Sequence, residues 1–179
     1  MSTERIKMKE KNIVSMRKIL GVCVWSLFVF YCIALFFIFI ISRINMHIQP
    51  YENISNVLAR INLIPFKTVY EYIDKIINNR INVDTAIANL VGNVVVFLPM
   101  GAFLPYLFQR MRSFKKTILT IFLIVLGIEL IEIIFAMGAF DIDDFIFNIG
   151  GAMIGYSITL IPFIAKLRDR IFTEVKETK

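Results

Sequence analysis

Four long apolar stretches constrain this chain more than any other feature of its sequence. They cover residues 19–41, 86–108, 117–137 and 145–165. A helix needs about 20 apolar residues to cross the hydrocarbon core of a bilayer. The first stretch has 23 residues, which is too long for the apolar part of a cleavable signal peptide. We therefore predict an all-α integral membrane protein, built as a bundle of four transmembrane helices.

Composition supports this class and argues against a soluble enzyme or a nucleic-acid-binding protein. Of the 179 residues, 58% are hydrophobic and only 19% are charged, whereas soluble domains are about 45–50% apolar. The net charge of +6 comes from basic residues that flank the apolar stretches, where they meet lipid head groups. Membrane lipids, and not nucleic acid, are therefore the expected partners of this basic surface.

Lysine and arginine positions predict the orientation. Six lie in the tail at 1–18, four in the connection between the second and third stretches, and five in the tail at 166–179. The third connection, around Asp141, carries none, and the five in the connection at 42–85 are widely spread. Because cytoplasmic segments are enriched in basic residues, both tails are predicted to be cytoplasmic and the first and third connections to face out of a plasma membrane.

The first outer connection contains a pattern typical of an amphipathic helix. Apolar residues recur at helical spacing over about 67–79, with charged residues between them. Thr68 and Glu71 have the spacing of a capping box. We predict an interfacial helix on the outer membrane surface or across the mouth of the bundle. A lid over a site and simple interfacial packing are both open interpretations.

The second stretch is interrupted by two prolines, Pro99 and Pro105. A proline inside a helix removes a hydrogen bond and bends the axis. We expect a bent or broken helix between Phe97 and Pro105, which would open space in the bundle. Residues 86–165 are predicted to form the last three helices of the bundle.

Polar residues within the last three stretches gather toward the outer side. Such groups are costly in a bilayer and usually mark a functional site. At 1.5 Å per residue, Asn93 and Glu129 lie at similar depths. The polar side chains predicted to converge in an outward-facing pocket are Asn89, Asn93, Glu129, Glu132, Asp141, Asp144 and Asn148.

Each of these residues also has a purely structural interpretation. Asp141 and Asp143 could cap the fourth helix, and Asn93 and Asn148 could form hydrogen bonds between helices. Gly151 and Gly155 form a G-x-x-x-G pair that favours close helix packing. The glutamates favour a site, because two carboxylates on one helix face repel each other unless one is protonated or a cation is bound.

A divalent cation is one candidate ligand. Ca²⁺ and Mg²⁺ prefer several carboxylate oxygens, and Glu129, Asp141 and Asp144 could supply them. Zinc is disfavoured, because the single histidine and the two cysteines, Cys23 and Cys32, lie far from these acids in the sequence.

Several short motifs together resemble the VanZ-like family. The resemblance spans about residues 62–156. The motifs are Asn62-Leu63-Ile64-Pro65-Phe66, Asn89–Asn93 with Phe97–Gly101, Ile128-Glu129-Leu130, Phe140–Asp144, and Asn148–Gly151 through Tyr156. The family often has Gln where this chain has Glu132 and Arg where it has Gly138. The resemblance implies a multi-pass plasma-membrane protein of bacteria. Its namesake lowers susceptibility to teicoplanin and related lipoglycopeptides.

Three functions remain open from the sequence. The first is an envelope protein whose acidic pocket binds an amphiphilic ligand, such as a lipid-linked cell-wall component or a lipoglycopeptide. The second is an enzyme that acts on a lipid phosphate with a carboxylate acid or base and a divalent cation. The third is a small ion-coupled transporter. It is disfavoured because the polar residues do not continue to the cytoplasmic side.

Overall fold

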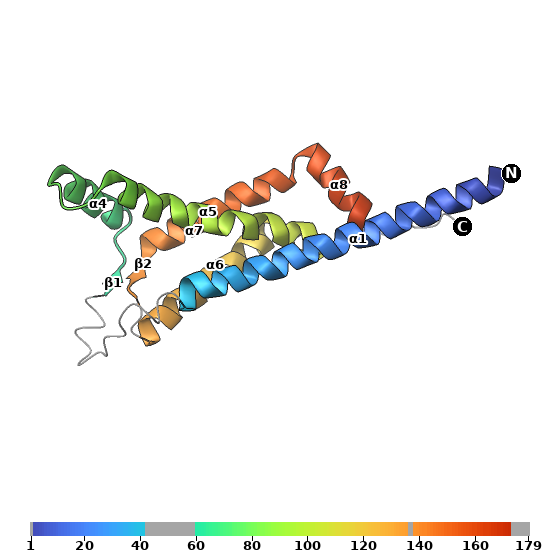
Figure 1. Cartoon of the computed structure of the whole chain (residues 1–179). Helices are drawn as coiled ribbons and strands as arrows, with labels where there is room; N and C mark the ends of the chain where they lie inside the picture. Colours follow the sequence, from blue (N-terminus) through green and yellow to red (C-terminus); the bar gives the residue numbers. More distant parts are fainter. Residues whose placement is uncertain (1, 42–59, 136–137, 173–179) are drawn as a thin grey trace.

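The structure, a computed structural model, describes residues 2–41, 60–135 and 138–172. The first part of the predicted outer connection (42–59) and half of the predicted C-terminal tail (173–179) lie outside the described residues. The long elements are α1 (Ser2–Phe36), α4 (Lys67–Ile77), α5 (Val83–Leu107), α6 (Phe114–Ile134), α7 (Ile142–Thr159) and α8 (Pro162–Phe172) (Figure 1). The short ones are the π-helix η1 (Phe37–Ile41), the 3-10 helix η2 (Gln109–Arg112) and the strands β1 (Ile61–Asn62) and β2 (Phe140–Asp141).

The predicted all-α membrane class is confirmed. Within the described residues, three helices are long and apolar enough to span a bilayer: α1 over Lys11–Phe39, then α5 and α6. The α7–α8 pair passes the same test as one broken span, so the total reaches four if that pair is counted. The first helix begins at Ser2, and so includes the basic tail that was predicted to precede it.

The fourth predicted span, 145–165, is wrong as one continuous helix. α7 ends at Thr159, and α8 leaves it at an angle of 78°. Pro162 explains the break, because it lacks a backbone N–H and disfavours helical geometry in the residue before it. The hydrogen-bond pattern changes there from i→i−4 to i→i−3, because the N–H of Ile161 donates to the carbonyl of Ile158 at 3.2 Å.

The second span was expected to be bent or broken between Phe97 and Pro105, and it is not broken, because α5 is a single helix through Pro99 and Pro105. A neighbouring helix supports the turn before Pro99. The hydroxyl of Tyr31 in α1 donates a hydrogen bond to the carbonyl of Val96 at 2.7 Å. A proline is tolerated in a membrane helix when neighbouring side chains satisfy the backbone around it.

α5 and α7 form the closest helix pair. A Cβ atom added to Gly151 would lie 1.9 Å from the carbonyl oxygen of Val94, and one added to Gly155 would lie 1.9 Å from that of Leu98. On α5, Gly101 lies equally close to the backbone of α7. Residue numbers rise together on the two helices, so the helices run parallel. The backbones touch only because these positions carry no side chain.

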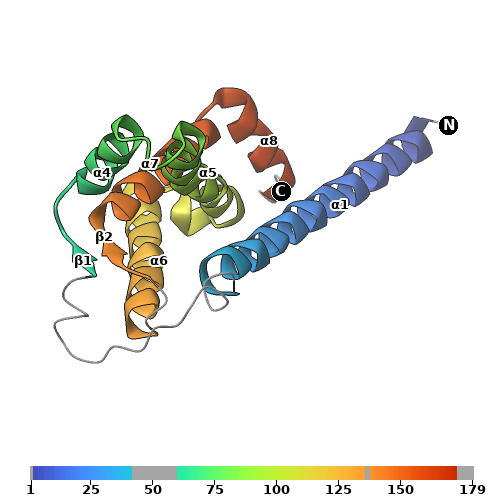
Figure 2. The ribbon, with the colours of Figure 1, turned by 60° about the vertical axis from the view of Figure 1, so that its left-hand side comes forward.

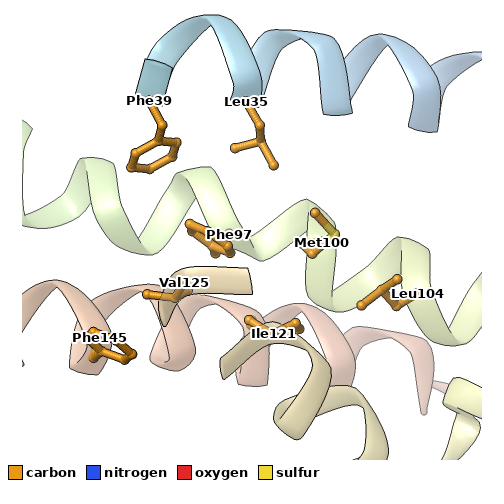
Figure 3. Packing of buried hydrophobic residues seen from close by; sticks show 9 residues of the cluster. Leu35, Phe39, Phe97, Met100, Leu104, Ile121, Val125 and Phe145 are labelled. Atoms are coloured by element: carbon orange, nitrogen blue, oxygen red, sulfur yellow. The ribbon is translucent and has the colours of Figure 1, made fainter. Parts of the chain in front are cut away.

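The hydrophobic core joins α1 and α6 to this pair (Figure 3). Leu35 at the end of α1 and Phe39 in η1 face Phe97 of α5, and the Phe39 and Phe97 ring centroids are 5.8 Å apart. α6 contributes Ile121 and Val125, both essentially inaccessible.

The two ends of the bundle differ. α4 and the strand pair lie at one end, and α8 lies at the other, where it crosses from α7 to α1 (Figures 1 and 2). β1 and β2 form a parallel pair, with Ile61 opposite Phe140 and Asn62 opposite Asp141. This pair joins the two connections that were predicted to face outward. We call this end of the molecule the polar end.

Candidate functional site

Asp141 organises the polar end. It is the N-cap of α7, and its Oδ1 accepts a hydrogen bond from the N–H of Asp143 at 2.9 Å. The same oxygen accepts from Nδ2 of Asn62 at 2.9 Å, and Oδ2 accepts from the hydroxyl of Thr68. The capping role considered for Asp141 is confirmed. Both of its oxygens are also tied to the first connection.

Asp143 caps a different helix from the one expected. Its side chain is 1% exposed. Its two oxygens accept hydrogen bonds from the N–H groups of Phe66 and Thr68, the latter at 2.9 Å. These donors belong to the start of α4, which follows Phe66 in a left-handed conformation (φ 64°). The capping box predicted for Thr68 and Glu71 is therefore wrong, because Asp143 from α7 takes its place.

Asn93 and Asp144 connect the two packed helices directly. The side-chain Nδ2 of Asn93 in α5 donates a hydrogen bond to Oδ1 of Asp144 in the first turn of α7. Both side chains are half-buried. This contact fixes the register of the parallel helices at the polar end, about two turns before Gly151 on α7.

The two glutamates of α6 are buried at the same end. Glu129 is 2% exposed and Glu132 is 1% exposed. Oε2 of Glu129 accepts a hydrogen bond from the N–H of Asp141 at 3.2 Å. We name the linked residues the polar cluster: Asn62, Thr68, Asn93, Glu129, Asp141, Asp143 and Asp144.

Asn148 lies one turn deeper in α7 than Asp144. Its side chain is 2% exposed, and within the described part of the chain its Oδ1 has no hydrogen-bond partner. A buried acceptor left without a donor costs about 1–3 kcal/mol. Such a group in a native structure is often explained by a functional role or an ordered solvent molecule.

Asn89 does not belong to this group. It is exposed, and its Nδ2 donates to the carbonyl of Thr85 at 2.9 Å within its own helix. The prediction that it joins the other polar residues is therefore wrong. The reason is register: Asn93 already reaches the first turn of α7, and Asn89 lies about 6 Å farther along the α5 axis.

The predicted metal ligands do not form a metal centre. Among residues 2–41, 60–135 and 138–172, no three His, Cys, Asp or Glu side chains are arranged to hold a metal ion. Glu129, Asp141 and Asp144 instead direct oxygens to separate donors: an N–H group, Asn62 with Thr68, and Asn93. This arrangement does not fit the Ca²⁺ or Mg²⁺ site considered from the sequence.

The charges of the polar cluster act on Tyr72 of α4. Burial raises the pKa of its phenol above the usual value of 10.0, and the negative charges of Asp144, Asp141 and Glu71 raise it further. The N–H groups of Phe66 and Thr68 bind Asp143, so the start of α4 is held at the polar end.

Sequence reasoning missed Asn62, Thr68 and Tyr72 as members of the site. Asn62 belongs to one of the short motifs quoted above, and that was its only signal. Thr68 was interpreted as a local cap. Tyr72 was taken as one apolar position of an amphipathic pattern. None of the three lies in an apolar stretch, where a polar residue stands out.

Two cavities of the described structure lie away from the polar cluster. One runs along α1 beside Trp25 and Phe30, and another lies between α1 and α8. Neither is lined by a residue of the polar cluster. At the polar end, the structure describes a dense set of hydrogen-bond acceptors that is partly covered by α4.

The chemistry of the polar cluster is suited to ligand groups that donate hydrogen bonds or carry a positive charge. Its members are carboxylates, amides and a hydroxyl, and such groups bind ligand groups that carry N–H, O–H or positive charge. No histidine, cysteine or basic side chain is among its members. The cluster therefore lacks the usual nucleophile–base pair of covalent catalysis.

Comparison with known proteins places these motifs in a family. The family model described as VanZ/LLP1 matches residues 28–164. A curated relative, Protein VanZ of Enterococcus faecium, is 33% identical over 69 residues, which cover 38% of this chain and 42% of the relative. The similarity thus spans less than half of that relative's length. No solved structure matches the chain. The family match includes α5, α6, α7, the polar cluster and the glycine contacts, so this chain belongs to the VanZ/LLP1 family.

Proposed function

We propose that this protein is a multi-pass protein of the bacterial cell membrane whose polar cluster faces outward and binds an amphiphilic or lipid-linked ligand. The observation that carries the proposal is the burial of Glu129, Glu132 and Asp143 at one end of the bundle. Carboxylates in such positions are expensive, and in membrane proteins they usually serve function.

The distribution of basic residues supports the outward orientation. The α8 end carries Arg110 and Arg112 in η2, Lys115 and Lys116 at the start of α6, and Lys166 in α8. The segment between α6 and α7, at the polar end, has no lysine or arginine. The positive-inside rule therefore assigns the α8 end and both termini to the cytoplasm.

α4 has the surface expected of a helix at the membrane interface. Its exposed half is divided in two: Tyr70, Ile73 and Ile77 form an apolar stripe, while Lys67, Glu71 and Asp74 form a charged stripe beside it. On the opposite half, Thr68 binds Asp143 and Asp141, and Tyr72 is partly buried. In our proposal α4 lies in the outer interface with the apolar stripe toward lipid, and also covers the polar cluster.

The same end offers both kinds of contact that an amphiphile needs. Leu63, Ile64 and Phe66 are exposed apolar residues in the segment that leads into α4. Directly behind them lie Asn62 and the carboxylates of Asp141 and Asp143. Acyl chains would contact the apolar residues, and amine, amide or sugar hydroxyl groups would donate to the cluster. Oδ1 of Asn148 is one further acceptor.

The family suggests which ligands to test. The namesake of the VanZ-like family lowers susceptibility to teicoplanin, a lipoglycopeptide with an acyl chain and amine and sugar groups. We propose that this protein also lowers teicoplanin susceptibility, and that it does so by binding the drug or a lipid-linked cell-wall component.

Teicoplanin susceptibility of a sensitive Gram-positive host tests this proposal. The host carries the wild-type protein, N93A, D144N, N89A or an empty vector, at equal membrane expression. We expect the wild type to raise the inhibitory concentration, N93A and D144N to abolish the rise, and N89A to retain it. N89A is the matched control because Asn89 lies one turn from Asn93 and outside the cluster. A rise that persists in N93A and D144N would exclude the cluster as the working site.

A further inference from the structure

A second candidate binding site lies at the opposite end of the molecule, between α1 and α8. A cavity of about 500 Å³ separates the two helices there. α1 lines it with Ile13, Met16, Arg17 and Leu20. α8 lines it with Leu167, Arg170 and Ile171. We call it the α1–α8 cavity.

The spacing shows that each helix presents one continuous face to this cavity. Positions 13, 16, 17 and 20 are three and four residues apart, as are positions 167, 170 and 171. Each face is apolar except for one arginine, Arg17 or Arg170. The cavity therefore combines apolar walls with two guanidinium groups.

Within the described residues, no carboxylate neutralises these two arginines. The one carboxylate of α8, Asp169, is engaged elsewhere, with Arg112 at 3.2 Å and Arg168 at 3.1 Å. The hydrogen bond from Arg168 lowers the pKa of Asp169, which keeps it charged in that ion pair. Neither Arg17 nor Arg170 forms an ion pair with another residue of the described chain.

The cavity walls are held in place by packing at their far end. Gly21 of α1 lies against the side chains of Ile171 and Phe172, with an added Cβ only 3.8 Å from Ile171. Phe172 also packs edge-on against Tyr106 of α5, with centroids 5.6 Å apart. These contacts hold α8 between α1 and α5, and Figure 1 shows α8 reaching from the end of α7 to α1.

We infer that the α1–α8 cavity binds an anionic phospholipid from the adjacent leaflet. Arg17 lies just before the predicted first span, where lipid phosphates are found, and α8 leaves α7 at 78° at the same end. The two guanidinium groups would hold the phosphate, since arginine pairs with phosphate in a bidentate manner. The acyl chains would lie along Met16, Leu20 and Leu167. Basic cavities between membrane helices recognise acidic head groups by this combination of contacts.

Native mass spectrometry of the full-length protein in detergent tests the inference. The probes are a phosphatidylglycerol and a phosphatidylcholine with the same acyl chains. The variants are R17Q/R170Q, R17K/R170K and K115Q/K116Q. The last pair is the matched control, because Lys115 and Lys116 are exposed at the same end and lie outside the cavity. Their replacement removes the same two positive charges as R17Q/R170Q.

The expected result is one phosphatidylglycerol bound at least tenfold more tightly than phosphatidylcholine. R17Q/R170Q should weaken the affinity for phosphatidylglycerol about 30-fold, which is about 2 kcal/mol at 1.4 kcal/mol per factor of ten. K115Q/K116Q should change this affinity less than threefold, and R17K/R170K should retain most of it. Thermal unfolding without added lipid shows whether each variant is folded.

Any of three results would overturn the inference. The first is an equal loss of binding in R17Q/R170Q and K115Q/K116Q, which would mean general charge attraction. The second is equal affinity for the two lipids in the folded wild-type protein. The third concerns the phosphate group alone. Glycerol phosphate, which has the charge but no acyl chains, should not displace the bound lipid. Displacement by it would show that the cavity binds phosphate alone and would also contradict a lipid site.

Discussion

The carboxylate of Asp143, in the first turn of α7, accepts a hydrogen bond from the backbone N–H of Thr68, in the first turn of α4, at 2.9 Å. A second oxygen accepts from the N–H of Phe66. One buried carboxylate thereby caps a helix that lies 75 residues earlier in the chain. It ties α4 to the end of the bundle that carries the polar cluster.

Removal of this carboxylate should loosen α4 while the transmembrane helices remain. D143A leaves two N–H groups without acceptors, at a cost of about 1–3 kcal/mol. We expect faster hydrogen exchange at residues 66–70 and a lower melting temperature in detergent. E71Q is the control. Its ion pairs with Lys67 (3.9 Å) and Lys75 (3.7 Å) are half-exposed and contribute little. Unchanged exchange in D143A would show that the cap is not formed.

Adjacent glycines of α7 should respond differently to alanine. In G151A the new Cβ would meet the carbonyl of Val94 at 1.9 Å, so α5 and α7 must separate. In G150A nothing lies within 4 Å of the new atom. We expect G151A to lower stability by about 1–3 kcal/mol, as for other overpacked interiors, and G150A to leave it unchanged or slightly raised. Equal melting temperatures for the two variants would rule out the close α5–α7 contact.

Chemical labelling should show that α4 and the start of α6 lie on opposite sides of the membrane. In a background with Cys23 and Cys32 replaced by alanine, D74C places a thiol on the exposed face of α4, and K115C places one at the exposed start of α6. A membrane-impermeant maleimide should label D74C in intact cells and K115C only after permeabilisation. The reverse pattern would invert the proposed orientation.

The phenol of Tyr72 should ionise at unusually high pH. Burial and the charges of Asp144 and Asp141 disfavour its anion, so its pKa lies above 10.0. Because the folded state holds this proton more tightly than the unfolded state, its contribution to stability is complete below pH 10 and is lost above it. The difference in phenolate absorbance between wild type and Y72F reports this titration. D144N should lower the Tyr72 pKa only in part, since burial remains. A Tyr72 that titrates at or below pH 10 would place α4 away from the cluster.

Much of the architecture could be predicted from the sequence, because apolar stretches and helical periodicity extend over many residues. The apolar stretches gave α1, α5 and α6 to within a few residues at most boundaries, apart from the early start of α1. Helical periodicity located α4, which ends at Ile77. These features depend on 11 or more residues each, so no single contact outweighs them.

The predictions that failed concern features that depend on single residues or on the register of one helix against another. β1 and β2 have two residues each and no periodic pattern. Thr68 looked like a local cap because its partner, Asp143, is remote in sequence. Asn89 and Asn93 share a helix face, but only the register of α5 against α7 decides which of them reaches Asp144. The break at Pro162 did have a local signal, but the apolar residues around it favoured a continuous span.

The most direct test of the outward polar cluster as a ligand site is binding to the purified protein in lipid nanodiscs. Teicoplanin and a lipid-linked peptidoglycan precursor would be titrated separately against wild type, D144N, N93A and N89A. We predict saturable binding of at least one of them to the wild type, weakened at least tenfold in D144N and N93A and retained in N89A. Equal binding to wild type and D144N, or no binding of either ligand to the folded wild-type protein, would contradict the proposed site.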